Sequence, residues 1–219
     1  MAVSRKFNIQ NSTFKTAAAL AAAALPALWL GLRAAAGDLG ANPIETVTHF
    51  TGDWALRFLL LTLALTPLRV LTGWNGFARF RRMLGLFAFF YAALHVLTYV
   101  WLDKFFAWPE IARDIVKRPF ITAGVVGFAI LVPLAATSTA GMIRRLGGRA
   151  WKRLHRLAYL AAVAGVVHFW WLVKADVSRP RTYAVAFAVV AAVRLYVAWR
   201  PTSGTTAPAG SRASTSASR

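Results

Sequence analysis

Six long apolar segments alternate with shorter polar ones along the chain. They cover residues 16–32, 51–72, 83–102, 119–138, 151–173 and 183–199. Each holds about 17–23 residues, the length that an α-helix needs to cross the ~30 Å hydrocarbon core of a bilayer. The pattern therefore predicts an all-α, polytopic membrane bundle with six transmembrane helices.

The polar flanks divide the chain into three predicted parts. Residues 1–15 are an N-terminal segment, residues 16–199 the transmembrane domain and residues 200–219 a tail. The tail contains only Arg, Pro, Thr, Ser, Gly and Ala, so it cannot bury a core and is predicted to be disordered. The first apolar run also has features of a signal peptide, because basic residues precede it and three alanines follow it at 34–36. We favour a retained span.

Charge sets the predicted orientation. The 219 residues include 26 Lys and Arg against 7 Asp and Glu, for a net charge of +19, while the mean hydropathy is +0.52. With the N-terminus inside, 16 basic residues fall on the inner side and 8 on the outer side. The positive-inside rule therefore predicts that both termini lie in the cytoplasm. All seven acids then fall outside.

The same composition excludes several function classes. No nucleic-acid recognition module is visible, so the basic residues are better explained by topology and by anionic membrane lipids. The chain has no cysteine, which excludes disulfides, thiolate-bound haem and covalent c-type haem. It also has no glycine-rich dinucleotide motif, so an electron donor and an electron acceptor would have to be separate molecules.

Two histidines lie deep within apolar segments. His95 is 12 residues beyond Met83, about 18 Å into its segment, and His168 is 14 residues beyond Leu154, about 21 Å into its own. Both segments run from the inner to the outer side, so the two imidazoles should be level in the outer half of the bilayer. Ionisable groups are costly there and usually functional, and imidazole is a common haem ligand. The pair is predicted to hold a haem iron, with packing or proton transfer as the alternative.

The other two histidines are weaker candidates. His155 precedes His168 by 13 residues, about 19.5 Å nearer the inner face, and about 140° away around a straight helix. It has no visible histidine partner, so it is a candidate ligand for a second haem with a different partner, or a flavin, quinone or phospholipid contact. His49 lies at the outer interface, where an ordinary surface role is at least as good an interpretation.

Basic residues crowd two inner loops and are candidates for binding anionic groups. Guanidinium groups pair well with haem propionates, flavin phosphate or lipid phosphate, although topology alone also explains the crowding. Arg57 and Arg194 lie near the ends of apolar segments and can extend to the interface without a functional role. The inner-loop set comprises Arg79, Arg81, Arg82, Arg144, Arg145, Arg149, Arg153 and Arg156.

Several short blocks resemble the MsrQ family, formerly called YedZ. The blocks are GANP at 40–43, HFTG at 49–52, RRMLGL at 81–86, LH at 94–95, RPF at 118–120, TST at 137–139 and WKRLH at 151–155, followed by His168. They occur in order, and the resemblance extends from about residue 26 to residue 199.

The resemblance implies a ferric-reductase-like transmembrane domain that binds haem b and FMN in the bacterial inner membrane. The family's haem histidines correspond to His95, His168 and, less directly, His155. The implied role is an electron-transfer subunit, not catalytic alone, that takes electrons from the quinone pool or a cytoplasmic flavin reductase. The implied acceptor is MsrP, a periplasmic molybdopterin protein that reduces methionine sulfoxide in oxidised periplasmic proteins. A metal reductase acting on a small acceptor and a non-redox transporter or proton-conducting bundle remain as alternatives.

Overall fold

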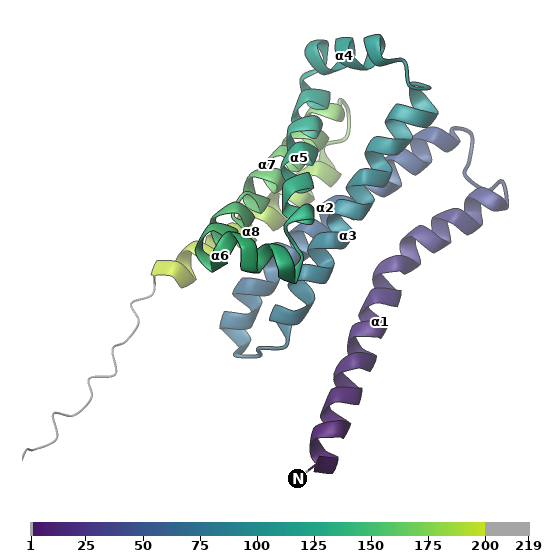
Figure 1. Cartoon of the computed structure of the whole chain (residues 1–219). Helices are drawn as coiled ribbons and strands as arrows, with labels where there is room; N and C mark the ends of the chain where they lie inside the picture. The colour runs from purple at the N-terminus through teal and green to yellow at the C-terminus, as the bar shows by residue number, and fades with distance from the viewer. Residues whose placement is uncertain (1, 200–219) are drawn as a thin grey trace, which may run out of the picture.

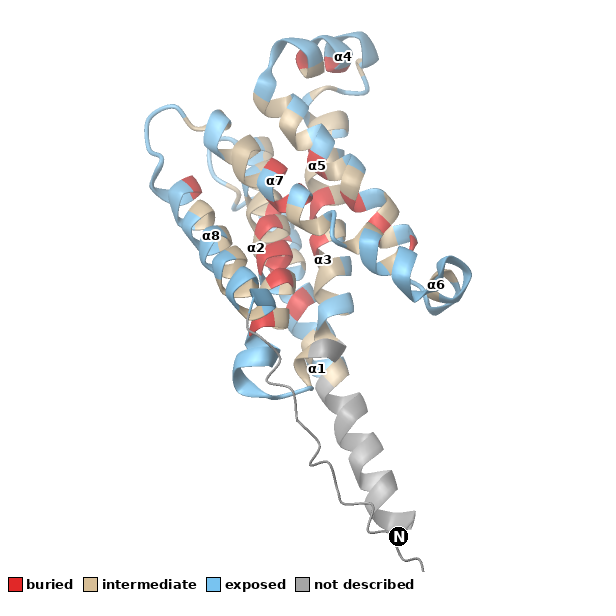
Figure 2. Ribbon diagram, turned by 90° about the vertical axis from the view of Figure 1, so that its left-hand side faces the viewer, coloured by how far each residue is buried: buried red, intermediate tan, exposed pale blue. Residues whose placement is uncertain are grey.

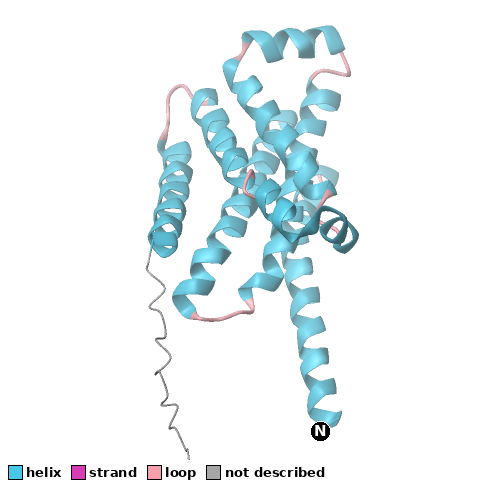
Figure 3. Ribbon diagram, turned by 60° about the vertical axis from the view of Figure 1, so that its left-hand side comes forward, coloured by secondary structure: helices cyan, strands magenta, loops and turns pink. Residues whose placement is uncertain are grey.

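The computed structural model describes residues 2–199, with side chains for residues 16–77 and 80–199. Throughout this range the secondary structure is helical and no strand occurs (Figure 3). The tail predicted for residues 200–219 lies outside the described residues. The helices are α1 (Ala2–Ala35), α2 (Pro43–Thr72), α3 (Phe77–Leu97), η1 (Thr98–Asp103, a π-helix), α4 (Trp108–Lys117), α5 (Pro119–Ala136), α6 (Ala140–His155), α7 (Ala158–Leu172) and α8 (Ser178–Trp199).

The long helices run along one common direction, and two short helices lie across their ends (Figure 1). Helix α4 crosses one end of the bundle, together with the α1–α2 and α7–α8 connections, and α6 crosses the other. We refer to these as the α4 end and the α6 end. The α4 end carries the connections that were predicted to face outwards.

Five helical segments are long and apolar enough to span a membrane, within the part of the chain that the structure describes. They are Thr16–Ala35, Pro43–Thr72, Phe80–Asp103, Pro119–Ala136 and Ser178–Trp199. These correspond to five of the six predicted spans, so the chain is a multi-pass membrane protein. The count of six remains a prediction, because α7 has only 15 residues and covers about 22 Å.

The fifth predicted segment, residues 151–173, is not one helix. It is interrupted after His155 by a tight turn in which the amides of Arg156 and Leu157 bond to carbonyls three residues earlier. His155 therefore belongs to α6 and His168 to α7. The prediction that they share one regular helix, with a fixed rise and a 140° offset, was wrong, because the backbone tightens here to hydrogen bonds three residues apart, although Arg156 and Leu157 keep right-handed helical dihedrals.

The apolar pattern did not predict α4 and α6, because both are short and rich in charged residues. Helix α4 begins with Pro109 in its first turn, where a missing amide proton costs nothing. Helix α6 begins at Thr139, whose hydroxyl accepts a hydrogen bond from the amide of Met142 over 3.2 Å. It is kinked at Gly147, whose φ of 73° favours glycine.

The core lies between α2 and the helices around it. Buried positions gather where α2, α3, α5 and α7 face one another, whereas α8 is largely exposed in the isolated chain (Figure 2). Small residues on α7 allow its backbone to approach the neighbouring helices, as is common in membrane bundles. The buried residues of this core are Ala23, Leu56, Phe58, Leu59, Leu60, Leu63, Ala88, Tyr91, Ala92, Leu131, Ala161 and Ala162.

Tyr91 joins α1 to this core. Its ring is fully buried against Phe58, and its hydroxyl donates to the carbonyl of Ala23 over 3.0 Å. The same oxygen accepts from the amide of Ala27 over 2.9 Å. In an uninterrupted helix these two backbone groups would bond to each other. The hydroxyl is thus inserted into the hydrogen-bond ladder of α1, one residue beyond Pro26, and both backbone groups stay satisfied.

Candidate functional site

The two deeply placed histidines come together between α3 and α7. The ring centroids of His95 and His168 are 5.9 Å apart, and the ring planes are inclined by 83°. The prediction that the two imidazoles reach the same level on separate helices is thereby confirmed. Neither helix supplies both residues, so their approach depends on how the helices pack.

Each imidazole is fixed by a backbone carbonyl on a neighbouring helix. His95 Nδ1 lies 2.9 Å from the carbonyl oxygen of Thr48 on α2, and His168 Nδ1 lies 2.6 Å from that of Phe120 on α5. A carbonyl can only accept, so each Nδ1 carries the proton and donates it. The neutral ring then keeps a lone pair on Nε2, which is the nitrogen that can bind a metal.

Each ring also lies directly against a glycine. A Cβ atom added at Gly52 would lie 3.0 Å from His95 Nδ1, and one added at Gly124 would lie 2.8 Å from His168 Nδ1. The rings therefore occupy space that any other residue would fill at these positions. The sequence contains no local signal for this contact, because each glycine is far from its histidine along the chain.

A cavity of about 360 Å³ opens beside the two histidines. Ile111 and Ile115 of α4 close it at the α4 end. The remaining wall is mostly apolar, which excludes water and lowers the local dielectric constant. This wall includes Leu56, Leu59, Phe128, Leu131, Phe169 and Leu172.

The donor set fits haem better than a bare metal ion. Among the described residues, no group of three or more His, Cys, Asp or Glu side chains could hold a metal. Two imidazoles are too few for a protein-only site, but they are the number that haem iron takes when the porphyrin fills its other positions. Two imidazoles that bind one metal from opposite sides, each at about 2 Å, keep their ring centres about 6 Å apart. The observed separation agrees with this requirement.

Polar residues border the cavity near the α4 end. His49 is exposed there, and Asp53 bonds to the guanidinium of Arg179 on α8. Arg57, which was predicted only to extend to the interface, lies 3.9 Å from the same carboxylate and donates to the hydroxyl of Tyr183 over 3.0 Å. These contacts connect α2 to the start of α8.

Helix α4 is held over the cavity by Asp114. Its carboxylate accepts from Tyr99 over 2.9 Å and lies 3.1 Å from both Lys104 Nζ and Arg118 Nε. Burial acts to raise the pKa of Asp114, but the hydrogen bonds from Lys104 and Tyr99 and the positive charges of Lys104 and Arg118 outweigh it, so the pKa is lowered. The ionised carboxylate is thus the form that fixes α4.

His155 lies apart from the pair. Its ring stacks on Trp151 with centroids 3.9 Å apart, and its Nδ1 donates to the carbonyl of Trp151 over 3.1 Å. Ser138 Oγ is 3.5 Å from Nε2. Trp151 in turn donates to the carbonyl of Thr137 over 3.0 Å, which fixes α6 against the end of α5. His155 does not line the cavity beside His95 and His168.

Arginines from several helices converge near the α6 end. Arg81 donates a hydrogen bond to the hydroxyl of Thr66 over 3.2 Å. Arg194 and Arg69 are close enough for their positive charges to repel that of Arg81. The guanidinium of Arg194 lies over the ring of Tyr159, 5.1 Å from its centroid. The Tyr159 hydroxyl is buried and forms no hydrogen bond of normal distance and angle with a described residue, although the Arg194 guanidinium is close enough to act as a weak partner.

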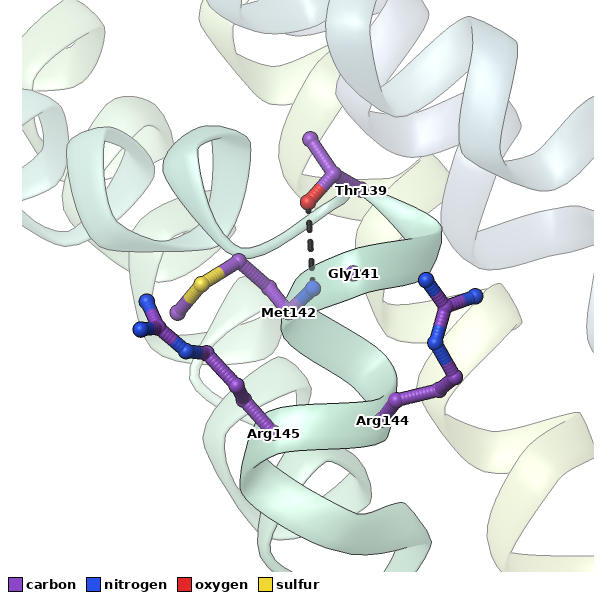
Figure 4. Close-up of a pocket in the computed structure, with 5 residues that line it drawn as sticks. All are labelled: Thr139, Gly141, Met142, Arg144 and Arg145. Atoms are coloured by element: carbon purple, nitrogen blue, oxygen red, sulfur yellow. Dashed lines mark hydrogen bonds between the residues drawn. The ribbon is translucent and has the colours of Figure 1, made fainter.

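A second, open pocket lies at the start of α6. It is lined by Thr139, Gly141, Met142, Arg144 and Arg145, and the two guanidiniums extend to either side of the helix (Figure 4). The positive N-terminus of the helix and both arginines favour an anionic neighbour. This part of α6 thus presents positive charge at the end of the bundle that was predicted to face inwards.

The comparisons with known proteins agree with this arrangement. A family described as "Ferric reductase like transmembrane component" matches residues 51–166, which include His95 and His155. A protein of Herminiimonas arsenicoxydans named "Protein-methionine-sulfoxide reductase heme-binding subunit MsrQ" is 52% identical over 191 residues, covering 86% of this chain and 88% of its own. Namesakes from Rhodospirillum rubrum and Xanthomonas campestris pv. campestris (strain 8004) are 55% and 51% identical, over 84% and 77% of this chain and 88% and 77% of their own.

These matches cover most of the chain at about half identity, and the helical membrane bundle is of the kind that the matched transmembrane domain requires. The chain therefore belongs to the MsrQ family, with a transmembrane domain of the ferric reductase type.

Proposed function

We propose that this chain is a membrane cytochrome that binds haem b between His95 and His168 and passes electrons to a methionine sulfoxide reductase. The observation that carries the proposal is the pair of imidazoles, 5.9 Å apart, each with Nδ1 committed to a carbonyl. The relatives' names, which specify a heme-binding subunit of that reductase, support the same assignment.

The protein's own residues would set the conditions for electron transfer. When bound, haem supplies a one-electron iron couple. The carbonyls of Thr48 and Phe120 hold the two rings in one tautomer and make Nε2 a stronger ligand. The apolar wall excludes water, and α4 covers the cavity at the α4 end. These features fix the ligands in advance, so little rearrangement is needed when the iron changes charge.

The direction of transfer follows from the proposed orientation, with the α6 end in the cytoplasm and the α4 end in the periplasm. Electrons would enter from the quinone pool or a cytoplasmic flavin reductase and leave to the periplasmic molybdopterin protein MsrP. The pair lies under α4, and this supports an exit on that side. In liposomes containing the haem-loaded protein, a reduced quinone analogue or a flavin reductase with NADH should each be tested as donor. Donation by neither would contradict this path.

FMN is part of the proposal on the basis of the family resemblance. The cluster of Arg81, Arg194 and Tyr159 supports an anionic group near the α6 end, because neither guanidinium has an acidic partner among the described residues and the tyrosine hydroxyl beside them is buried. FMN titrated into flavin-free protein should bind the wild type more tightly than Arg194→Gln. Equal affinity would remove this cluster from the flavin site.

A second haem at His155 is a subordinate proposal. Ser138 Oγ lies 3.5 Å from Nε2 of His155, at the long limit for a hydrogen bond, and the carbonyl of Leu134 also lies near the ring. If a second haem binds there, purified His155→Ala protein should contain about half the haem of the wild type. An unchanged haem-to-protein ratio would restrict the site to one haem.

The main test is the absorption spectrum of protein purified from haem-replete cells. The dithionite-reduced wild type should show a b-type spectrum with bis-imidazole ligation. His95→Ala and His168→Ala should each lose the haem bound by the pair, because a single remaining imidazole holds it weakly. Val163→Ala, on the exposed side of α7, is the matched control and should retain it. Normal bis-imidazole haem in both histidine variants would refute the proposal.

A further inference from the structure

The two imidazoles share a feature that neither helix sequence reveals. The carbonyl bonded by His95 belongs to Thr48, and the glycine against which the ring lies, Gly52, comes four residues later. The carbonyl bonded by His168 belongs to Phe120, and Gly124 again comes four residues later. The same relation thus occurs on α2 and α5, although the two helices are unrelated in local sequence.

Helix geometry explains why the spacing is four. In an α-helix each Cα–Cβ bond tilts towards the N-terminus, so a side chain covers the turn that precedes its own residue. The side chain at position 52 would therefore cover the carbonyl of Thr48, and that at position 124 the carbonyl of Phe120. Each carbonyl can accept the helical amide four residues on and still has a second lone pair. At Thr48 the Thr51 hydroxyl also approaches this oxygen, at 3.1 Å, so His95 shares the carbonyl with it. Only glycine leaves that lone pair open to a ring from another helix.

We propose that Gly52 and Gly124 are positioning residues of the haem site, each exposing a helix carbonyl that fixes one histidine. The inference rests on the proposed function, because the rings it positions are the proposed ligands. A Cβ at position 124 would overlap His168 Nδ1 at 2.8 Å, and one at position 52 would press on His95 Nδ1 at 3.0 Å. The His168 ring would have to move off its carbonyl and the His95 ring would have to shift by a few tenths of an ångström, so both hydrogen bonds that strengthen the ligands would be lost or weakened.

The test compares Gly52→Ala and Gly124→Ala with Gly85→Ala. Gly85 also faces a neighbouring helix, but its Cβ would lie 3.6 Å from Thr62 Cγ2, an ordinary contact. We expect both site variants to bind haem about 10–100-fold more weakly, Gly124→Ala the more so. The haem that remains should have altered ferric EPR g-values and a more positive midpoint potential, because the ligand is a weaker donor. Gly85→Ala should match the wild type in haem affinity, EPR g-values and midpoint potential.

The outcomes separate this inference from the function on which it rests. If His95→Ala and His168→Ala lose haem while both glycine variants keep the wild-type affinity, g-values and potential, the inference is wrong and the function stands. If the histidine variants keep haem, the function itself fails. Should the glycine variants not fold, ¹⁵N NMR of histidine-labelled wild-type protein in the ferrous state decides. The Nδ1 proton of both ligands is expected to exchange slowly with water and to show the low-field shift of a hydrogen-bonded proton, and freely exchanging Nδ1 protons on both ligands would overturn the inference.

Discussion

Two tyrosine hydroxyls in this bundle, those of Tyr91 and Tyr159, differ in the hydrogen bonds that they form. Tyr91 and Tyr159 are both at least partly enclosed by helices, but among the described residues only Tyr91 has hydrogen bonds of normal geometry to its oxygen, whereas the Tyr159 hydroxyl has only the weak approach of the Arg194 guanidinium. A buried polar group without a partner costs free energy, and one that bridges two backbone groups would leave both unsatisfied if it were removed. The two residues therefore predict opposite effects of the same substitution.

Tyr91→Phe should lower the free energy of unfolding by about 1–3 kcal/mol, because the carbonyl of Ala23 and the amide of Ala27 would lose their shared partner. Tyr159→Phe, its matched control, should leave stability unchanged or raise it slightly. Thermal unfolding of the purified, cofactor-free variants in detergent checks both. A larger loss for Tyr159→Phe would show that its hydroxyl has a partner of its own.

At the scale of helices, α4 depends on one carboxylate. The Asp114 pKa lies below its ordinary value, so the folded state binds the proton more weakly than the unfolded chain. The stabilising contribution is therefore complete above the unfolded pKa of about 4 and is lost as the pH falls through the lower folded value. The protection factors of the α4 amides, which compare their exchange rates with those of an unstructured chain at the same pH, should be high at neutral pH and fall in that acid range.

Asp114→Asn should remove the pH dependence of α4 protection and leave the α4 amides weakly protected even at neutral pH. The free energy that holds α4 in place should fall by about 1–3 kcal/mol. Glu110→Gln is the matched control, because Glu110 lies 3.9 Å from the same lysine but is largely exposed. It should exchange like the wild type. If Asp114→Asn kept α4 protected, the carboxylate would not be what holds this helix.

The sequence predicted the elements unequally. Length and apolar character predicted six spans, of which five are helices long and apolar enough to cross a membrane, and depth along two of the predicted segments indicated that His95 and His168 would meet. The break after His155 was not predicted, because it depends on two backbone hydrogen bonds, and the basic residues Lys152, Arg153 and Arg156 around it were interpreted as the inner end of a single span. The hydrogen bonds from the two histidines to the carbonyls of Thr48 and Phe120 were not predicted either. Every residue has a backbone carbonyl, so the residue type does not indicate which carbonyl accepts a hydrogen bond. Which helical turn lies against the ring of His95 or His168 depends only on how the helices pack.

At the scale of the whole molecule, charge is divided between the two ends. The acids that pair with arginine and lysine lie at the α4 end, in the networks around Asp53 and Asp114. Near the α6 end, Arg81 and Arg194 have no acidic partner among the described residues. The two faces therefore suit different neighbours, a protein surface of mixed charge at one end and phosphate groups at the other.

The proposed ligands also come from opposite halves of the bundle. α2 packs most extensively on α3, and α5 on α7, so each helix pair carries one histidine together with the carbonyl that fixes it. Coordination of one iron by both would cross-link the two pairs, which already pack on each other through α2 with α7 and through α3 with α5. Loss of the haem should therefore loosen both pairs together, so the chain without haem should unfold as a whole at a lower temperature.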